Sequence, residues 1–159
     1  MFKSLVSGEE EPSEKPLNLL SESDFSGKRV LLVEDNDLNQ EIAQEILKMA
    51  GLTVEIAENG KEAVRLFSGM PENYYDMILM DIQMPLMNGY EAAEALRSME
   101  REDAQNVPII AMTANAFADD VLAAKNAGMN EHIAKPLDML RLQELLGDYL
   151  NRKKYFRRR

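Results

Sequence analysis

The sequence contains no cysteine and only one histidine, His132. Disulfide bonds and thiolate metal sites are therefore excluded, and a single histidine cannot build a multi-histidine metal site. No apolar run approaches the roughly 20 residues that span a bilayer, and no basic segment followed by an apolar run opens the chain. These absences indicate a protein of the cytoplasm that does not insert into a membrane.

Charge of one sign dominates most of the chain. The net charge is −10, yet six of the last eight residues, RKKYFRRR, are basic. The remaining residues hold 12 Lys and Arg against 28 Asp and Glu, a net charge of −16. Because so acidic a surface repels polyanions, we expect no nucleic-acid partner.

Composition divides the chain into three parts. Residues 1–26 include the segment GEEEPSEKP, which has little to bury, and we expect them to form an acidic flexible linker. Residues 27–151 have the composition of one folded domain. Residues 152–159 form a basic tail, with two interpretations: a solvated terminus, or an element that binds an anionic partner.

Strand-like and helix-like patterns alternate five times within the predicted domain. Short apolar runs predict strands, and apolar residues three or four apart predict helices. The predicted strands are 29–33, 53–57, 76–80, 107–112 and 132–134, and the predicted helices are 37–50, 59–67, 89–100, 116–127 and 138–150. In the first helix the apolar residues at helical spacing are Leu38, Ile42, Ile46 and Met49, and in the second Ala63, Val64 and Phe67 face inward. The alternation predicts an α/β fold, a single doubly wound five-stranded parallel sheet with helices on both faces.

Polar side chains follow four of the five predicted strands. Glu34 and Asp35 come directly after the first strand, Asp81 after the third, Thr113 after the fourth and Lys135 after the fifth. In a sheet of this kind, ligands bind outside the carboxyl ends of the strands, at the switch point in strand order. These five side chains are therefore predicted to meet in one site.

The residue types in this set suit phosphoryl chemistry at a metal ion. Three clustered carboxylates repel one another and need a cation, and oxygen ligands favour Mg²⁺. Asp81 can then act as a carboxylate nucleophile, while Lys135 and Thr113 hold the phosphoryl oxygens. Each residue also has a plainer interpretation. Asp81, Thr113 and the Glu34–Asp35 pair could be turn residues or helix caps, and Lys135 a surface lysine.

Four strings in the chain match a known family. They are VLLVEDN at 30–36, MDIQMPLMNG at 80–89, AMTANA at 111–116 and HIAKP at 132–136. With these strings in this order, the chain resembles the receiver domains of response regulators, which are CheY-like. The resemblance is closest to the receiver domains of hybrid sensor histidine kinases. It implies the (βα)5 flavodoxin-like receiver fold over about residues 27–150.

The resemblance also implies a role for each matched residue of the site. Asp81 corresponds to the phosphoacceptor, Asp35 to a direct Mg²⁺ ligand, and Glu34 to a ligand that acts through water. The backbone carbonyl of Gln83 corresponds to a further Mg²⁺ ligand. Lys135 corresponds to the lysine that pairs with the phosphate.

Further matched positions concern switching and backbone shape. Thr113 corresponds to the switch hydroxyl, and Pro136 to a proline that follows a cis peptide bond. Gly89 fits a sharp backbone turn into the next helix. His132 occupies a position where many receivers carry a rotating Tyr or Phe. It is either a switching residue of this kind or a structural histidine.

These matches predict a phosphoacceptor receiver domain of a two-component phosphorelay. A histidine kinase or histidine phosphotransfer protein would supply a phosphoryl group from phosphohistidine to Asp81, with Mg²⁺ as cofactor. Phosphorylation would then change the surface of the fourth helix and fifth strand, which would bind a partner or a second copy as a homodimer. No independent enzyme activity is expected beyond self-catalysed transfer to Asp81 and autodephosphorylation.

Several alternatives stay open at this point. The domain is expected to be part of, or a partner to, a hybrid sensor histidine kinase, and the alternative is a stand-alone single-domain response regulator that acts by protein contact. A phosphohydrolase with an aspartyl nucleophile is a remote alternative, because its acid/base Asp would stand where this chain has Gln83. A flavodoxin-like nucleotide binder is disfavoured by the acidic EDNDLN segment after the first strand.

The phosphorylated form is expected to be long-lived. Gln83 and Asn115 lie two residues after Asp81 and Thr113, at positions that tune hydrolysis of the phosphoryl group in this family. Because both are neutral amides, we predict a lifetime of minutes or longer. The loss of phosphoryl mass with time in Mg²⁺ measures this lifetime, and decay within a second would contradict the prediction.

Overall fold

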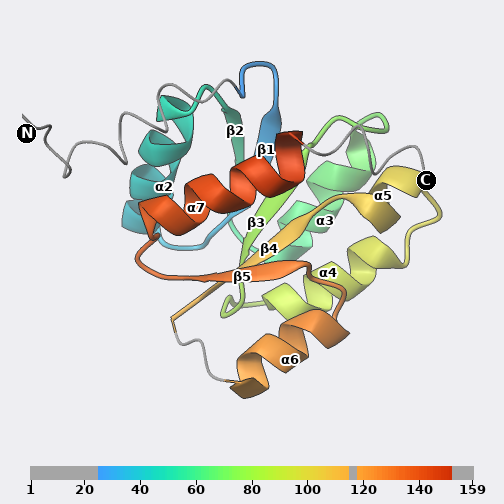
Figure 1. Cartoon of the computed structure of the whole chain (residues 1–159). Helices are drawn as coiled ribbons and strands as arrows, with labels where there is room; N and C mark the ends of the chain where they lie inside the picture. The colour runs from blue at the N-terminus through green and yellow to red at the C-terminus, as the bar shows by residue number, and fades with distance from the viewer. Residues whose placement is uncertain (1–24, 115–117, 152–159) are drawn as a thin grey trace, which may run out of the picture.

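The computed structural model describes residues 25–114 and 118–151. Its centre is a parallel sheet of five strands in the order β2-β1-β3-β4-β5 (Figure 1). The strands are β1 (Arg29–Val33), β2 (Thr53–Ala57), β3 (Met77–Asp81), β4 (Ile109–Thr113) and β5 (Glu131–Ala134). The strand order reverses between β1 and β3, which creates the switch point expected of a doubly wound sheet. The predicted fold class is confirmed.

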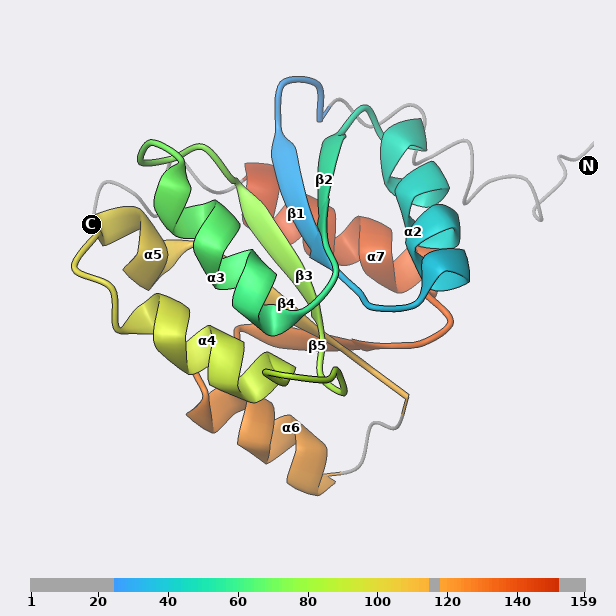
Figure 2. The same cartoon turned by 180° about the vertical axis from the view of Figure 1, so that it is seen from behind.

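Helices cover both faces of this sheet. They are α2 (Asp37–Met49), α3 (Gly60–Gly69), α4 (Gly89–Arg97), α5 (Glu102–Asn106), α6 (Ala118–Asn126) and α7 (Met139–Leu146), with a π-helical turn at Gly147–Asn151 after α7. Helices α2 and α7 lie on one face, and α3 and α4 lie on the other (Figures 1 and 2). No helix in these described ranges has the length and hydrophobicity needed to cross a membrane.

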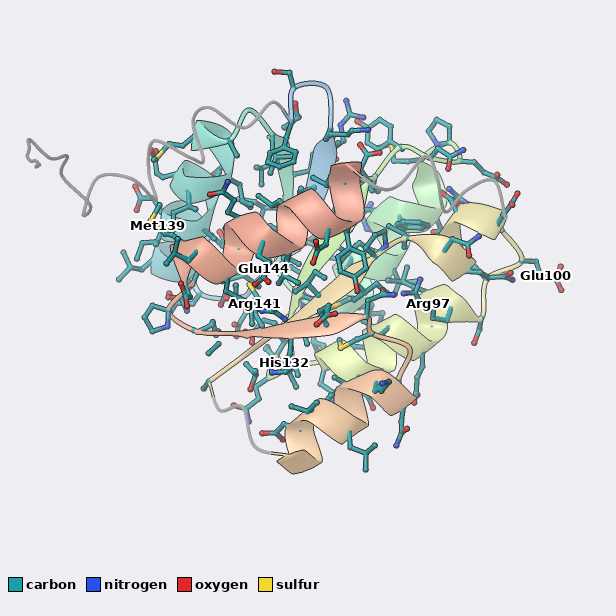
Figure 3. All side chains as sticks on the ribbon, in the orientation of Figure 1. Arg97, Glu100, His132, Met139, Arg141 and Glu144 are labelled. Atoms are coloured by element: carbon teal, nitrogen blue, oxygen red, sulfur yellow. The ribbon has the colours of Figure 1, made fainter. Side chains whose placement is uncertain are left out.

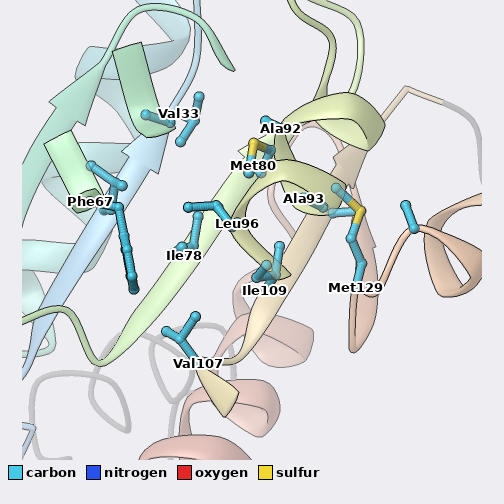
Figure 4. Close-up of a cluster of buried hydrophobic side chains, with 14 of the residues drawn as sticks. Val33, Phe67, Ile78, Met80, Ala92, Ala93, Leu96, Val107, Ile109 and Met129 are labelled. Atoms are coloured by element: carbon cyan, nitrogen blue, oxygen red, sulfur yellow. The ribbon is translucent and has the colours of Figure 1, made fainter. Parts of the chain in front are cut away.

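The central strands are apolar along their length because both of their faces are covered. In β3, Ile78 and Met80 belong to the core cluster under α3 and α4, whereas Met77 and Leu79 belong to the cluster under α2 and α7. All four side chains are fully buried. Figure 4 shows the first cluster, with Leu96 of α4 beside Ile78. Continuous apolar runs are the pattern that a doubly covered parallel strand requires.

Helix α2 forms where it was predicted, but its apolar residues do not all face the core. Leu38 is 62% exposed and Ile42 is 48% exposed, while the helix buries Ala43 and Leu47 instead. The spacing of the larger apolar residues therefore identified the helix, but of the four named above only Ile46 packs against the core cluster.

Helix α5 was not predicted from the sequence, because its five residues carry no apolar period. A salt bridge supports it: Arg101 Nη2 lies 2.9 Å from Asp103 Oδ2. The same carboxylate accepts a hydrogen bond from the backbone N–H of Asn73 at 2.9 Å. The Arg101 guanidinium also lies 5.1 Å from the centre of the Phe67 ring. The contacts with Asn73 and Phe67 come from distant parts of the chain, so only the tertiary fold brings them to α5.

The folded domain begins earlier than the predicted boundary at residue 27. Phe25 is 2% exposed and packs in the core cluster under α2 and α7. Its burial places the start of the packed structure at least two residues into the predicted linker. The other predicted linker residues, 1–24, and the basic tail, 152–159, lie outside the described residues.

Candidate functional site

A pocket of about 830 Å³ opens at the carboxyl ends of the strands. The five side chains that the sequence singled out all line it: Glu34, Asp35, Asp81, Thr113 and Lys135. They meet there because β1, β3, β4 and β5 are parallel and adjacent, so their carboxyl ends share one edge of the sheet. The strand register pairs Asp81 with Met112, which places the end of β3 beside the end of β4.

Three carboxylates form a compact group in this pocket. Glu34, Asp35 and Asp81 each offer an oxygen, and these oxygens lie within 4.8 Å of one another. Glu34 is 2% exposed and Asp81 is 5% exposed, whereas Asp35 is open to solvent. Hard cations such as Mg²⁺ prefer carboxylate oxygens and keep several waters, so an acidic cluster with one open side fits Mg²⁺.

Lys135 places its ammonium between the two buried carboxylates. Its Nζ lies 3.3 Å from Glu34 Oε1 and 3.3 Å from Asp81 Oδ1. Its backbone N–H donates to the Thr113 carbonyl at 2.9 Å, which ties the end of β5 to the end of β4. The Lys135–Pro136 peptide bond is cis, the geometry that the family resemblance implies.

Burial and like charge shift the pKa values of the central pair. Burial raises the pKa of Asp81 to about 6, the Glu34 carboxylate adds to the rise, and Lys135 opposes it. Burial alone would lower the pKa of Lys135, but the two carboxylates outweigh it and raise that pKa. Lys135 is therefore protonated at neutral pH, while Asp81 is held in its charged form less firmly than an exposed aspartate.

The loop after β3 reaches the site through close backbone packing. The backbone N–H of Gln83 donates to the Asp81 carboxylate. A Cβ on Gly89 would lie 2.5 Å from the Asp81 carbonyl oxygen, so only glycine fits there. The need for glycine thus comes from close approach and not from the sharp turn expected at this position. The positive φ in the loop belongs to Leu86, at 70°.

The two predicted switch residues occupy different places. Thr113 ends β4, is 7% exposed and lines the pocket. His132 lies half-buried on β5, paired in register with Ala111, and is outside the set of described residues that line the pocket (Figure 3). Asn115, named above for its effect on hydrolysis, is outside the described residues.

Sequence reasoning missed several residues that line the pocket. Asn39 reaches it from α2, Tyr90 from α4 and Asp120 from α6. None follows a strand directly, so the rule that identified the other five does not find them. Asn39 stands in the first turn of α2, and no spacing in the sequence marks it as a pocket residue.

Comparison with known proteins agrees with this geometry. The response regulator receiver domain family matches residues 30–147 of the chain. The chain belongs to this family.

Among curated relatives, the receiver is similar to parts of much longer histidine kinases. It is 37% identical over 127 residues to the peroxide stress-activated histidine kinase mak1 of Schizosaccharomyces pombe, covering 79% of this chain and 8% of that protein. It is 38% identical over 131 residues to probable histidine kinase 2 of Oryza sativa, covering 76% of this chain and 12% of that protein. The chain therefore spans only a small fraction of the relatives it matches.

Two solved structures are similar along most of the receiver. One is the receiver domain of the sensor histidine kinase PA1611 from Pseudomonas aeruginosa, which has a magnesium ion coordinated in its active-site cleft. It shares 38% identity and a TM-score of 0.71, covering 79% of this chain and 99% of that one. The other is the receiver domain of the Saccharomyces cerevisiae response regulator Ssk1, in complex with the histidine phosphotransfer protein Ypd1. It shares 30% identity and a TM-score of 0.73, covering 81% of this chain and 92% of that one.

Neutralising Asp81 is expected to stabilise the metal-free protein at neutral pH. The pKa of Asp81 rises from 3.8 to about 6 in the folded state, so its ionisation opposes folding above that pH. We predict that Asp81→Asn increases the free energy of unfolding at pH 7 in EDTA by about 1–2 kcal/mol. The increase should shrink as pH falls from 6 towards 3.8, because Asp81 of the native protein then becomes neutral as well.

Urea unfolding followed by circular dichroism at pH 7 and pH 4.5 measures this difference. Glu45→Gln, which neutralises an exposed carboxylate on α2, is the matched control and should show no comparable gain. Equal stabilities of Asp81→Asn and the native protein at pH 7, or a gap that widens in acid, would contradict the prediction.

Proposed function

We propose that this domain accepts a phosphoryl group from a phosphohistidine onto Asp81 and signals through the resulting change of conformation. The observation that carries the proposal is the position of the Lys135 ammonium, 3.3 Å from both Asp81 and Glu34 inside one acidic pocket. A nucleophilic carboxylate, an acidic pair able to hold a cation, and a cation able to bind phosphoryl oxygens are the parts that such a transfer needs.

The carboxylates of Glu34, Asp35 and Asp81 and the backbone carbonyl of Gln83 are the groups that would hold Mg²⁺. When bound, the ion supplies positive charge that lets a phosphate approach an acidic pocket. An Asp81 oxygen forms the new bond to phosphorus as the phosphorus–nitrogen bond of phosphohistidine breaks, and the imidazole nitrogen keeps that electron pair. Lys135 can then leave its carboxylate partners and pair with phosphoryl oxygens.

The switch begins next to the modified carboxylate. Thr113 ends the strand beside β3 and lines the same pocket, which supports a contact between its hydroxyl and a phosphoryl group on Asp81. Movement of Thr113 would affect β5 through the hydrogen bond from Lys135 N–H to the Thr113 carbonyl. His132 lies on that strand. Phosphorylation would thus bias an existing equilibrium and alter the surface formed by α6 and β5, where a partner or second copy would bind.

A hybrid sensor histidine kinase is the proposed context, and the curated relatives support it because they are histidine kinases. The proposed phosphoryl donor is a histidine kinase or a histidine phosphotransfer protein. The Ssk1 receiver, which this chain resembles, was crystallised with a protein of the second kind. Such a donor must bring its histidine to the pocket, so it must contact the elements that surround it.

Exposed apolar side chains flank the pocket and suit such a contact. Leu38 and Ile42 lie one turn apart on α2, whose first turn lines the pocket through Asn39. Leu86 is 82% exposed in the loop after β3, next to the pocket residue Pro85. We propose that these three residues, here called the apolar rim, dock the phosphodonor protein. Adjacent exposed apolar side chains, such as Leu38 and Ile42 on α2, are typical of protein interfaces.

The proposed transfer is tested with acetyl phosphate, a small phosphodonor that needs no docking surface. The full chain is incubated with acetyl phosphate and Mg²⁺, and its intact mass is measured. We expect one added phosphoryl group, labile to hydroxylamine, and no addition to Asp81→Asn. An adduct that persists in Asp81→Asn would refute the assignment of Asp81. No adduct on the native chain, with Mg²⁺ binding shown separately, would refute self-catalysed transfer.

The apolar rim is tested with a protein donor, the phosphorylated Ypd1 of S. cerevisiae. Changing Leu38 and Ile42 together to Ser removes exposed apolar contacts, so transfer from Ypd1 should slow by on the order of tenfold. Phosphorylation by acetyl phosphate should keep its native rate. The control is Met49→Ser, which alters an exposed apolar residue at the far end of α2. Equal slowing with both donors, or transfer from Ypd1 to the double variant at the native rate, would count against the rim.

A further inference from the structure

Glu34 is held by side chains that belong to neither the acidic cluster nor the phosphate-binding set. The Asn39 Nδ2 amide donates to Glu34 Oε2 at 3.4 Å. The Gln40 Nε2 amide donates to the Glu34 backbone carbonyl at 2.6 Å. Both donors come from the beginning of α2. They therefore link this helix to the first residue of the acidic pair.

The two carboxylate oxygens of Glu34 have separate partners. Oε1 faces the Lys135 ammonium at 3.3 Å. Oε2 accepts from the Asn39 amide and from the backbone N–H of Asn36 at 3.2 Å. Because Glu34 is 2% exposed, bulk water is poorly placed to replace a lost donor. The orientation of this carboxylate thus depends on Lys135 at one oxygen and on the Asn36 N–H and the Asn39 amide at the other.

The donors themselves are anchored by the N-terminal cap of the helix. The backbone N–H of Asn39 donates to the Asn36 side-chain oxygen at 2.9 Å. The backbone N–H of Gln40 donates to the Asn36 carbonyl at 2.9 Å. These two bonds restrain the first turn of α2, from which both amides project. The side-chain hydrogen bond from Gln40 Nε2 to the Glu34 carbonyl also restrains the peptide group between Glu34 and Asp35.

We propose that Asn39 and Gln40 are positioning residues for the cation site: Asn39 orients the Glu34 carboxylate, and Gln40 fixes the backbone that carries Glu34 and Asp35. This inference rests on the proposed function, because it takes the acidic cluster to be a Mg²⁺ site. Partners that orient metal ligands contribute strongly to metal affinity although they do not touch the metal. The role of both amides is therefore to set Mg²⁺ affinity without contact with the phosphoryl group.

Mg²⁺ affinity measured by isothermal titration calorimetry on the full chain tests the proposal directly. Asn39→Ala removes one donor, and Gln40→Met removes the other while keeping its length and helix propensity. Each variant is expected to bind Mg²⁺ about tenfold more weakly than the native chain. Gln44→Met, the same change one turn further along α2, is the matched control and should bind Mg²⁺ with native affinity.

A double-mutant cycle shows whether Asn39 acts through the Glu34 carboxylate. If it does, Asn39→Ala should weaken Mg²⁺ binding in the native background and have no further effect in Glu34→Ala. The midpoint of thermal unfolding of each variant in EDTA, followed by circular dichroism, reports its metal-free stability. The positioning role would be overturned if Asn39→Ala weakened Mg²⁺ binding equally in the native and Glu34→Ala backgrounds. It would also be overturned if the loss of Mg²⁺ affinity among the variants simply matched their loss of metal-free stability.

The outcomes separate this inference from the proposed function. A native chain that binds no Mg²⁺ refutes the cation site itself. A native chain that binds Mg²⁺ and accepts phosphate from acetyl phosphate, with Asn39→Ala and Gln40→Met unchanged in Mg²⁺ affinity, refutes the inference and leaves the proposed function intact.

Discussion

The site depends on one ammonium group held between two buried carboxylates. Glu34 and Asp81 repel each other in a pocket where water screens them poorly, and the Lys135 Nζ lies 3.3 Å from both. At Asp81, burial and repulsion from Glu34 outweigh the attraction to Lys135, and together they raise its pKa to about 6. Stability is thus given up at the place where a second cation can restore it.

The elements that carry Glu34 and Asp81 are held firmly by packing. Central strands covered on both faces leave no freedom to slide, because a shift in register would move apolar side chains out of two clusters at once. Close backbone approach at Gly89 holds the loop that follows Asp81. On the other side, Asn39 and Gln40 tie α2 to Glu34. Repelling charges stay in place because packed elements on both sides restrain them.

Exposure is distributed unevenly around the pocket. The reacting carboxylate is buried, whereas apolar side chains of α2 and of the loop after β3 face solvent nearby. Leu86 also adopts a positive φ, which is unfavourable for any residue that carries a Cβ. Strained and exposed residues concentrate where proteins meet ligands or partners. Exposed apolar side chains, a strained backbone residue and a destabilised carboxylate thus occur together around the pocket.

The sequence by itself determined the fold class, the strands and the five side chains of the pocket. Helical spacing of apolar residues and short apolar runs indicate helices and strands, because both patterns reflect local structure. Residues directly after adjacent parallel strands must lie at the same edge of the sheet. Only the tertiary structure decided which face of α2 is buried, that α5 forms, and that Asn39 and Gln40 hold Glu34. These features depend on contacts between distant segments or on the direction of a side chain. Neither leaves a periodic signal, because a helix presents the same spacing of residues whichever face the sheet selects.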